Sequence, residues 1–196
     1  WDVQEGSITI GGHDVKEFTC DSLLKNMSMV FQNVYLFHDT IENNIKFGCP
    51  DATHEQVVEA AKKACCHDFI SALPQGYDTV IGEGGSTLSG GEKQRISIAR
   101  AMLKDAPIIL LDEATASVDP ENEVHLQQAI SALVKNKTLI VIAHRLSTIR
   151  DADQILVVDN GKIVEKGVHA ELIQQKGIYQ KFWNIRQKAR NWKLAQ

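Results

Sequence analysis

The sequence lacks several features that mark large classes of protein. Its 196 residues include only four cysteines, which form no C-x-x-C pair and lie at no zinc-finger spacing from a histidine. No apolar run approaches the roughly 20 residues that are needed to span a bilayer. The net charge of −4 at pH 7 gives no basic excess for binding nucleic acid by bulk electrostatics. These absences exclude a disulfide scaffold and indicate that nucleic acid is not a partner.

The chain does have the composition of a soluble globular protein. Hydrophobic residues make up 43% and charged residues 23% of the sequence, which excludes a disordered or collagen-like chain. A length of 196 residues suits one domain, or one domain with a small lobe, and allows a sizeable core. The chain opens on Trp1 and Asp2, with no initiator methionine and no signal peptide, so we expect it to be a fragment of a longer protein.

Strand and helix periods alternate along the chain. Residues 107–111 form an unbroken apolar run, which is typical of a central parallel strand covered on both faces. Asp119 and Pro120 read as the N-cap and first position of a helix, and Asn160-Gly161 is a hairpin turn signal. We expect further strands at residues 7–10, 27–31, 138–143 (buried), 154–158 and 162–165, and helices at 40–47, 54–66, 91–103, from 120 onward and over 169–190.

This alternation predicts an α/β fold with a parallel sheet. The stretch from residue 51 to residue 105 is mostly helical and separates the strands that flank it. We therefore expect an α/β core made of residues 1–50 and 106–196, with a helical lobe inserted at 51–105.

Two carboxylates, Asp112 and Glu113, follow the apolar run. Open α/β sheets bind ligands at the carboxyl edge of their strands, so both side chains would lie at a ligand site. There Asp112 could hold a hydrated Mg²⁺, and Glu113 could polarise a water for attack on a phosphate. On this signal alone, capping of the next helix is an equal alternative.

The octet Leu-Ser-Gly-Gly-Glu-Lys-Gln-Arg occupies residues 88–95. Ser89 offers a hydroxyl donor, and the glycines at 90 and 91 let a ligand approach the backbone closely. Free N–H groups and the helix dipole make such a helix start an anion site. A serine-capped helix with a glycine-rich lead-in is the structural alternative, but the whole octet is far more specific than a glycine pair.

Single polar residues, Gln32 and His144, follow two other predicted strands. Either one alone is most often an ordinary loop or core residue. Taken in order, the glutamine, the octet LSGGEKQR, the segment ILLDEATASVD and the final IAHR resemble the nucleotide-binding domain of ABC transporters. The resemblance covers about residues 6–180, and the segments 34–41 and 161–179 are similar to those of exporter-type domains.

The resemblance implies a P-loop NTPase-like sheet with an inserted helical lobe, and ATP and Mg²⁺ as cofactors. It also implies a role for each matching residue. The catalytic residues would be Glu113 and His144, the Mg²⁺ ligands Asp112 and Gln32, and the nucleotide-binding residues Gln32, Ser89, Gly90, Gly91 and Asp119.

The same resemblance implies ATP hydrolysis that drives transport across a membrane, in the export direction. Two such domains, identical or different, would pair head to tail, so that the signature of one completes the site of the other. Each would contact a transmembrane domain through its coupling helices, at the cytoplasmic face of the cell membrane.

One expected segment is missing from the sequence. A phosphate-binding loop needs G-x-x-x-x-G-K-[ST] between a strand and a helix, and the only Gly-Lys pair, Gly161-Lys162, does not fit it. We therefore expect a domain that is incomplete at its N-terminus and inactive by itself. The alternative is a non-hydrolytic chain that only contributes a signature motif to a partner. A soluble ABC ATPase of DNA repair or translation is disfavoured by the exporter-like segments.

Overall fold

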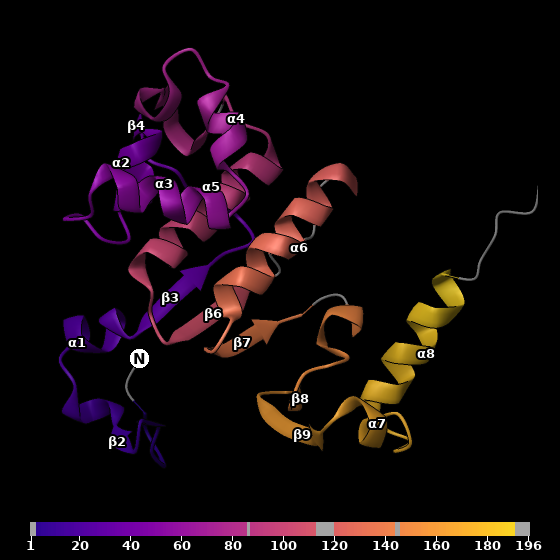
Figure 1. Cartoon of the computed structure of the whole chain (residues 1–196). Coiled ribbons are helices and arrows are strands. Elements are labelled where there is room, and N and C mark those ends of the chain that lie inside the picture. The colour runs from indigo at the N-terminus through magenta and orange to yellow at the C-terminus, as the bar shows by residue number, and fades with distance from the viewer. Residues whose placement is uncertain (1–2, 86, 113–119, 144–145, 191–196) are drawn as a thin grey trace, which may run out of the picture. The chain divides into compact units, whose positions relative to one another are not determined.

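The computed structural model describes residues 3–85, 87–112, 120–143 and 146–190 (Figure 1). The chain folds as two compact units, residues 1–142 and residues 143–196. Within the described ranges, no helix combines the length and the apolar character that a membrane span requires. The predicted α/β fold with a parallel sheet is confirmed, while the division into a core and a lobe at 51–105 stays a prediction.

The first unit is built on a three-stranded parallel sheet. Its strands are β3 (Met27–Val30), β6 (Ile108–Asp112) and β7 (Thr138–Ile142), in the order β3-β6-β7. The apolar run is therefore the central strand of this sheet, as predicted. Leu111 of β6 lies opposite Val30 on one side and Val141 on the other, so the three strands end together.

One face of the sheet packs against helices α5 (Gly90–Lys104) and α6 (Pro120–Val134) (Figure 1). Side chains of a strand alternate between the two faces, and this alternation sends Val30, Ile109 and Leu111 into the core, where they are 0%, 0% and 7% exposed. The helices bury Ile96, Ile98, Leu126 and Leu133 in the same cluster. Burial of each such side chain contributes about 1.5–3 kcal/mol, so this layer holds the first unit together.

The other face of the sheet is partly open. Met29, Ile140 and Ile142 are 47%, 55% and 60% exposed. The expectation that 138–143 forms a buried strand is therefore wrong, and β6 is not fully covered on both faces. The reason is positional: β7 is the edge strand of the described sheet, and Ile140 and Ile142 point away from α5 and α6.

Helices and a short two-stranded ribbon fill the chain between β3 and β6. Thr40 caps α2, and Thr53 caps α3 through a capping box with Gln56, in which each side chain bonds the other residue's backbone N–H. These local signals are visible in the sequence and fix where both helices begin. The elements are β4 (Asp39–Thr40) paired with β5 (Val80–Ile81), α2 (Ile41–Lys46), α3 (His54–Lys63) and α4 (His67–Ser71).

The chain before β3 forms small elements of its own. A two-residue hairpin pairs β1 (Thr9–Ile10) with β2 (His13–Asp14), and α1 (Cys20–Lys25) leads into β3. Short 3₁₀ turns occur at Val15–Glu17, Gly76–Asp78, Glu83–Gly85 and Leu146–Ile149.

The second unit is an antiparallel hairpin followed by two helices. Strands β8 (Ile155–Asp159) and β9 (Lys162–Gly167) are joined by Asn160 and Gly161, whose φ angles are 48° and 76°, as the Asn-Gly signal predicts. The helices are α7 (His169–Leu172) and α8 (Ile178–Arg190), not one continuous helix over 169–190. The break is fixed from β9: the carboxylate of Glu165 accepts the backbone N–H groups that begin α8.

Candidate functional site

The predicted residues Gln32 and Asp112 lie at the same edge of the sheet. Since β3, β6 and β7 are parallel, their carboxyl ends meet at one edge. Asp112 is the last residue of β6 and is half-buried beside Ile142, its partner in β7. Gln32 comes two residues after the end of β3 and is exposed. Open α/β sheets bind their ligands at this edge.

Asp112 also points toward the partly open face of the sheet, because it alternates with Leu111 of the core face. Its carboxylate and the side-chain oxygen of Gln32 are the hard oxygen ligands that Mg²⁺ prefers. Within the described part of the chain, no group of three or more His, Cys, Asp or Glu could hold a metal ion. Two such oxygens suit a Mg²⁺ that keeps waters and takes other oxygens from a phosphate, and the assignment of Asp112 and Gln32 as its ligands stays a prediction.

Three further predicted residues lie outside the part of the chain that the structure describes. Glu113 follows the end of β6, Asp119 precedes the first residue of α6, and His144 follows β7 by two residues. Their assignments remain predictions.

The signature octet forms the start of α5. Ser89 is the N-cap: its Oγ accepts a hydrogen bond from the N–H of Glu92 at 3.3 Å, and Glu92 Oε2 accepts from the N–H of Ser89 at 2.8 Å. The amides of Gly90 and Gly91 belong to the first turn, where N–H groups point along the helix axis. Ser89 and Gly90 are exposed, and Gly91 is buried. A capped, exposed helix start of this kind suits an anion.

The hydroxyl of Ser89 can make a further hydrogen bond besides the capping bond. Ser89 Oγ uses a lone pair to accept from Glu92, and a hydroxyl still has its proton to donate. The capping interpretation of the octet is therefore confirmed, and it is compatible with the ligand-binding interpretation, which stays a prediction.

The loop that carries Gln32 is anchored to the rest of the first unit. Leu36 is fully buried, and its carbonyl oxygen accepts from the N–H of Gly84 at 3.0 Å. Gln94 of α5 donates from Nε2 to the carbonyl oxygen of Phe31 at 3.3 Å. The octet and the loop of Gln32 are thus in direct contact, although 62 positions separate their residues 32 and 94 in sequence.

Sequence reasoning missed two polar residues next to this loop, the buried Asn44 and the half-buried Arg100. Arg100 Nε donates to the carbonyl oxygen of Asn44 at 2.8 Å, and the guanidinium carbon lies 5.3 Å from the ring centre of Phe47. Burial lowers the pKa of Arg100 to about 10, and the group stays charged at neutral pH. The only signal in the sequence is an arginine on the inward side of a predicted helix.

A cavity of about 310 Å³ lies beside Arg100. Its aromatic lining is exposed at the surface: Tyr35, Phe37 and Phe47 are 54%, 39% and 62% exposed. The rings pack edge to face or tilted, with centroids 5.4 Å apart for Tyr35 and Phe37 and 4.7 Å apart for Phe37 and Phe47. We call Tyr35, Phe37 and Phe47 the aromatic surface.

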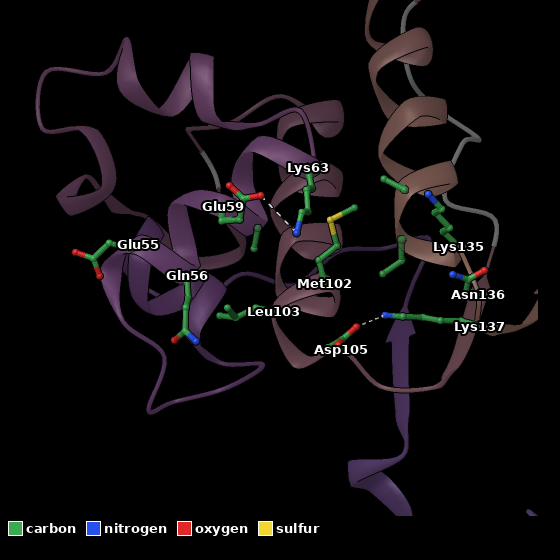
Figure 2. Close-up of a pocket in the computed structure, with 13 residues that line it drawn as sticks. Glu55, Gln56, Glu59, Lys63, Met102, Leu103, Asp105, Lys135, Asn136 and Lys137 are labelled. Carbon is green, nitrogen blue, oxygen red and sulfur yellow. Dashed lines mark ion pairs between the residues drawn. The ribbon is translucent and has the colours of Figure 1, made fainter.

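A larger cavity, of about 710 Å³, lies elsewhere (Figure 2). It is bounded by α3 and by the C-terminal ends of α5 and α6, and ion pairs line it: Lys137 with Asp105 at 2.8 Å and Lys63 with Glu59 at 3.4 Å. None of the predicted site residues that the structure describes lines it. Its size does not make it the candidate site.

Comparisons with known proteins give one consistent result. The family model described as "ABC transporter" matches residues 1–116. The ATP-dependent lipid A-core flippase of Vibrio cholerae is 52% identical over 186 residues, which are 94% of this chain and 32% of that protein. A Staphylococcus aureus protein named for multidrug export, an ATP-binding/permease protein, is 52% identical over 185 residues, again 94% of this chain and 32% of its own.

A solved structure agrees with the sequence relatives. A bacterial Atm1-family ABC exporter with ATP bound matches the whole chain with a TM-score of 0.88 and 44% identity, over 34% of its own length. The chain thus spans about a third of the length of each of these proteins.

Proposed function

Since the chain belongs to the ABC transporter family, we propose that it forms part of an ATP-hydrolysing domain that drives export across a membrane. The names of its relatives include the words ATP-dependent, flippase and export, and the solved relative is an exporter with ATP bound. Its cofactors would be ATP and Mg²⁺.

One observation carries this proposal: the contact between the signature helix and the edge of the sheet. Gln94 bonds the residue next to Gln32, and Gln32 and Asp112 share the carboxyl edge. A capped helix start that suits an anion and two candidate oxygen ligands therefore lie in one unit with a common core. Phosphoryl transfer needs both kinds of group, because its catalysis is mostly positioning and charge stabilisation, and in a pair of such domains one chain would supply the oxygen ligands and its partner the helix start.

In this proposal each predicted residue has its own role in the reaction. Asp112 and Gln32 would hold Mg²⁺, which when bound neutralises charge on the phosphate oxygens. Glu113 would accept the proton of the attacking water as general base. His144 would contact the terminal phosphate and orient that water. Asp119 would contact the partner domain and its nucleotide.

We further propose that two such domains pair head to tail. Ser89 and Gly90 are exposed at the start of α5, so the phosphate of a partner can reach them. The helix dipole and first-turn N–H groups would then stabilise the negative charge of that phosphate.

The aromatic surface is the proposed contact for a transmembrane domain. Contiguous exposed apolar groups mark interaction sites, and the three rings surround a cavity next to the loop of Gln32. Short coupling helices of the membrane domain would pack into it at the cytoplasmic face of the cell membrane. Contact there would report the state of the nucleotide site to the membrane domain.

The test is an ATPase assay on the natural protein that carries this sequence. Glu113→Gln keeps the size of the side chain but removes the base, so hydrolysis should fall about 10²–10⁴-fold while ATP-dependent pairing persists. Glu59→Gln, the same change at an exposed position of α3 (61% exposed), should leave the rate unchanged. Equal rates for Glu113→Gln and the parent would reject the proposal.

A further inference from the structure

The loop of residues 31–37 is attached to α5 near both of its ends. Near its start, Gln94, which is 4% exposed, donates from Nε2 to the carbonyl oxygen of Phe31. Near its end, Arg100 Nη1 donates to the carbonyl oxygen of Tyr35 at 3.4 Å. The two donors lie about 9 Å apart along the helix axis, at 1.5 Å per residue. Loop and helix are therefore joined at two separate points, with Gln32 between them.

The guanidinium of Arg100 is held by neutral groups. Its three hydrogen bonds go to the carbonyl oxygens of Asn44 and Tyr35 and to Asn44 Oδ1, the last at 3.3 Å. Its carbon lies 5.8 Å from the ring centre of Phe37 and 5.3 Å from that of Phe47. Hydrogen bonds to charged groups and cation–π contacts are strong when they are desolvated, so this one side chain fixes both the loop and the aromatic surface.

Asn44 completes the attachment. It is 1% exposed, and its Oδ1 accepts from the N–H of Phe37 at 2.8 Å while its Nδ2 donates to the carbonyl oxygen of Phe37 at 3.0 Å. Both backbone polar groups of Phe37 are thereby bound by one side chain, which in turn bonds Arg100. The path from α5 to Phe37 therefore runs through the side chains of Arg100 and Asn44.

The turn that follows α2 is also in tight contact with α5. A Cβ atom on Gly48 would overlap the carbonyl oxygen of Arg100, so the turn after α2 lies directly against α5. Helix α5, the loop and the aromatic surface are therefore packed as one body, and Ser89 lies roughly 16 Å from Arg100 along the same helix.

From this geometry we infer that Arg100 is a positioning residue that transmits nucleotide engagement at Ser89 to the loop of Gln32 and the aromatic surface. The inference rests on the proposed function, in which Ser89 contacts a phosphate. A movement of α5 at its N-terminal end carries Gln32, Tyr35 and Phe37 with it only while the Arg100 and Gln94 bonds hold. Arg100 acts through the loop and touches no reacting atom.

The test is amide hydrogen exchange of residues 31–37, with and without ATP, on the natural protein carrying Glu113→Gln so that the ATP-bound pair accumulates. We expect ATP to slow exchange in this loop. Arg100→Met keeps an apolar stem against the rings but removes every donor, so it should abolish the slowing at Tyr35–Phe37 while ATP-dependent pairing persists. Without ATP, the amide exchange rate of Tyr35–Phe37 in Arg100→Met should rise about tenfold or more, because one charge-assisted hydrogen bond is lost.

The matched control is Lys104→Met. Lys104 also donates from α5 to a carbonyl oxygen, that of Leu24 at 2.8 Å, but not in the loop, so its variant should keep the ATP-dependent slowing. A purely structural role for Arg100 would raise exchange equally with and without ATP and leave the difference between the two states unchanged.

Each outcome decides the question. Full ATP-dependent slowing in a folded, paired Arg100→Met protein would overturn the inference, as would pairing of the parent without any slowing in the loop. Failure of the parent to pair with ATP would instead reject the proposed function. If Arg100→Met does not fold, Gln94→Met should lose the slowing at residues 31–33, and unchanged slowing there would refute the transmission.

Discussion

Replacing Ser89 by aspartate should leave the first unit folded and prevent ATP-dependent pairing. Ser89 caps α5 by accepting from the N–H of Glu92, and Glu92 returns a bond to the N–H of Ser89. Aspartate is about as good an N-cap as serine, and its charge is favourable at a helix N-terminus. Ser89→Ala would instead remove the cap, at a cost of about 1 kcal/mol. The aspartate variant therefore separates function from stability.

The expected loss of pairing follows from Coulomb's law. Ser89 is exposed, and in a head-to-tail pair its side chain would meet the phosphate of the partner's nucleotide. Two unit negative charges about 4 Å apart repel by about 4 kcal/mol at an effective dielectric constant near 20. Since each 1.4 kcal/mol is a factor of ten, pairing should weaken by about three orders of magnitude for each composite site that carries the change.

Sedimentation of the Glu113→Gln protein with ATP measures this pairing, and thermal denaturation measures stability. Ser89→Gly removes the hydroxyl without adding charge, so it should weaken pairing only several-fold, the worth of one hydrogen bond. Thr53→Asp makes the equivalent change in the capping box of α3 and should affect neither property. If Ser89→Asp pairs as tightly as the parent, with an unchanged melting temperature, the start of α5 does not face a phosphate.

Three further results are expected. Gly48→Ala should destabilise the first unit by about 1–3 kcal/mol, because its Cβ would overlap the backbone of Arg100; denaturant unfolding measures this. Burial raises the pKa of Glu42, but hydrogen bonds with Lys46 at 2.7 Å and His54 at 2.6 Å outweigh it and leave that pKa below its ordinary value of 4.5. The stability that Glu42 contributes is therefore complete above about pH 4.5 and is lost as the pH falls through the lowered pKa, so Glu42→Gln should flatten the decline of the melting temperature in acid. The 196-residue polypeptide by itself, which contains no G-x-x-x-x-G-K-[ST], should show no steady ATP hydrolysis, and phosphate release above background would contradict this.

Local signals in the sequence predicted much of the fold. The start of α5 at Ser89, the central strand β6 and the turn at Asn160-Gly161 all occur where their capping residue, apolar run or turn pair indicated. Each of these signals lies within a few neighbouring residues, so no knowledge of distant contacts is needed to interpret it.

The errors concern contacts between distant segments. The run at 138–142 is apolar enough for a buried strand, but it is the edge strand of the described sheet, and Ile140 and Ile142 lie on the face that α5 and α6 do not cover. The helical pattern over 169–190 does not reveal that Glu165 bonds the N–H groups of Ile178 and Tyr179 and starts a second helix there.

The candidate site likewise has features that could be predicted from the sequence and features that could not. Asp112 and Gln32 could each be placed after a predicted strand, and the ends of parallel strands meet at one edge of the sheet. The bonds of Arg100 to Asn44 and Tyr35 join residues 56 and 65 positions apart, and no periodicity connects them. Only the packed structure shows that the signature helix holds the loop of Gln32.

The most direct measurement of the proposed head-to-tail arrangement is ATP hydrolysis by mixed pairs of the natural protein. In the first pair, one protomer carries Ser89→Arg and its partner carries Glu113→Gln. In the second pair, one protomer carries both changes and its partner carries neither. If Ser89 serves the partner's nucleotide, both lesions of the first pair fall on one composite site, and the other site still turns over, whereas the second pair has a lesion in each site and is inactive. Turnover by the second pair and none by the first would show that Ser89 serves the site of its own chain.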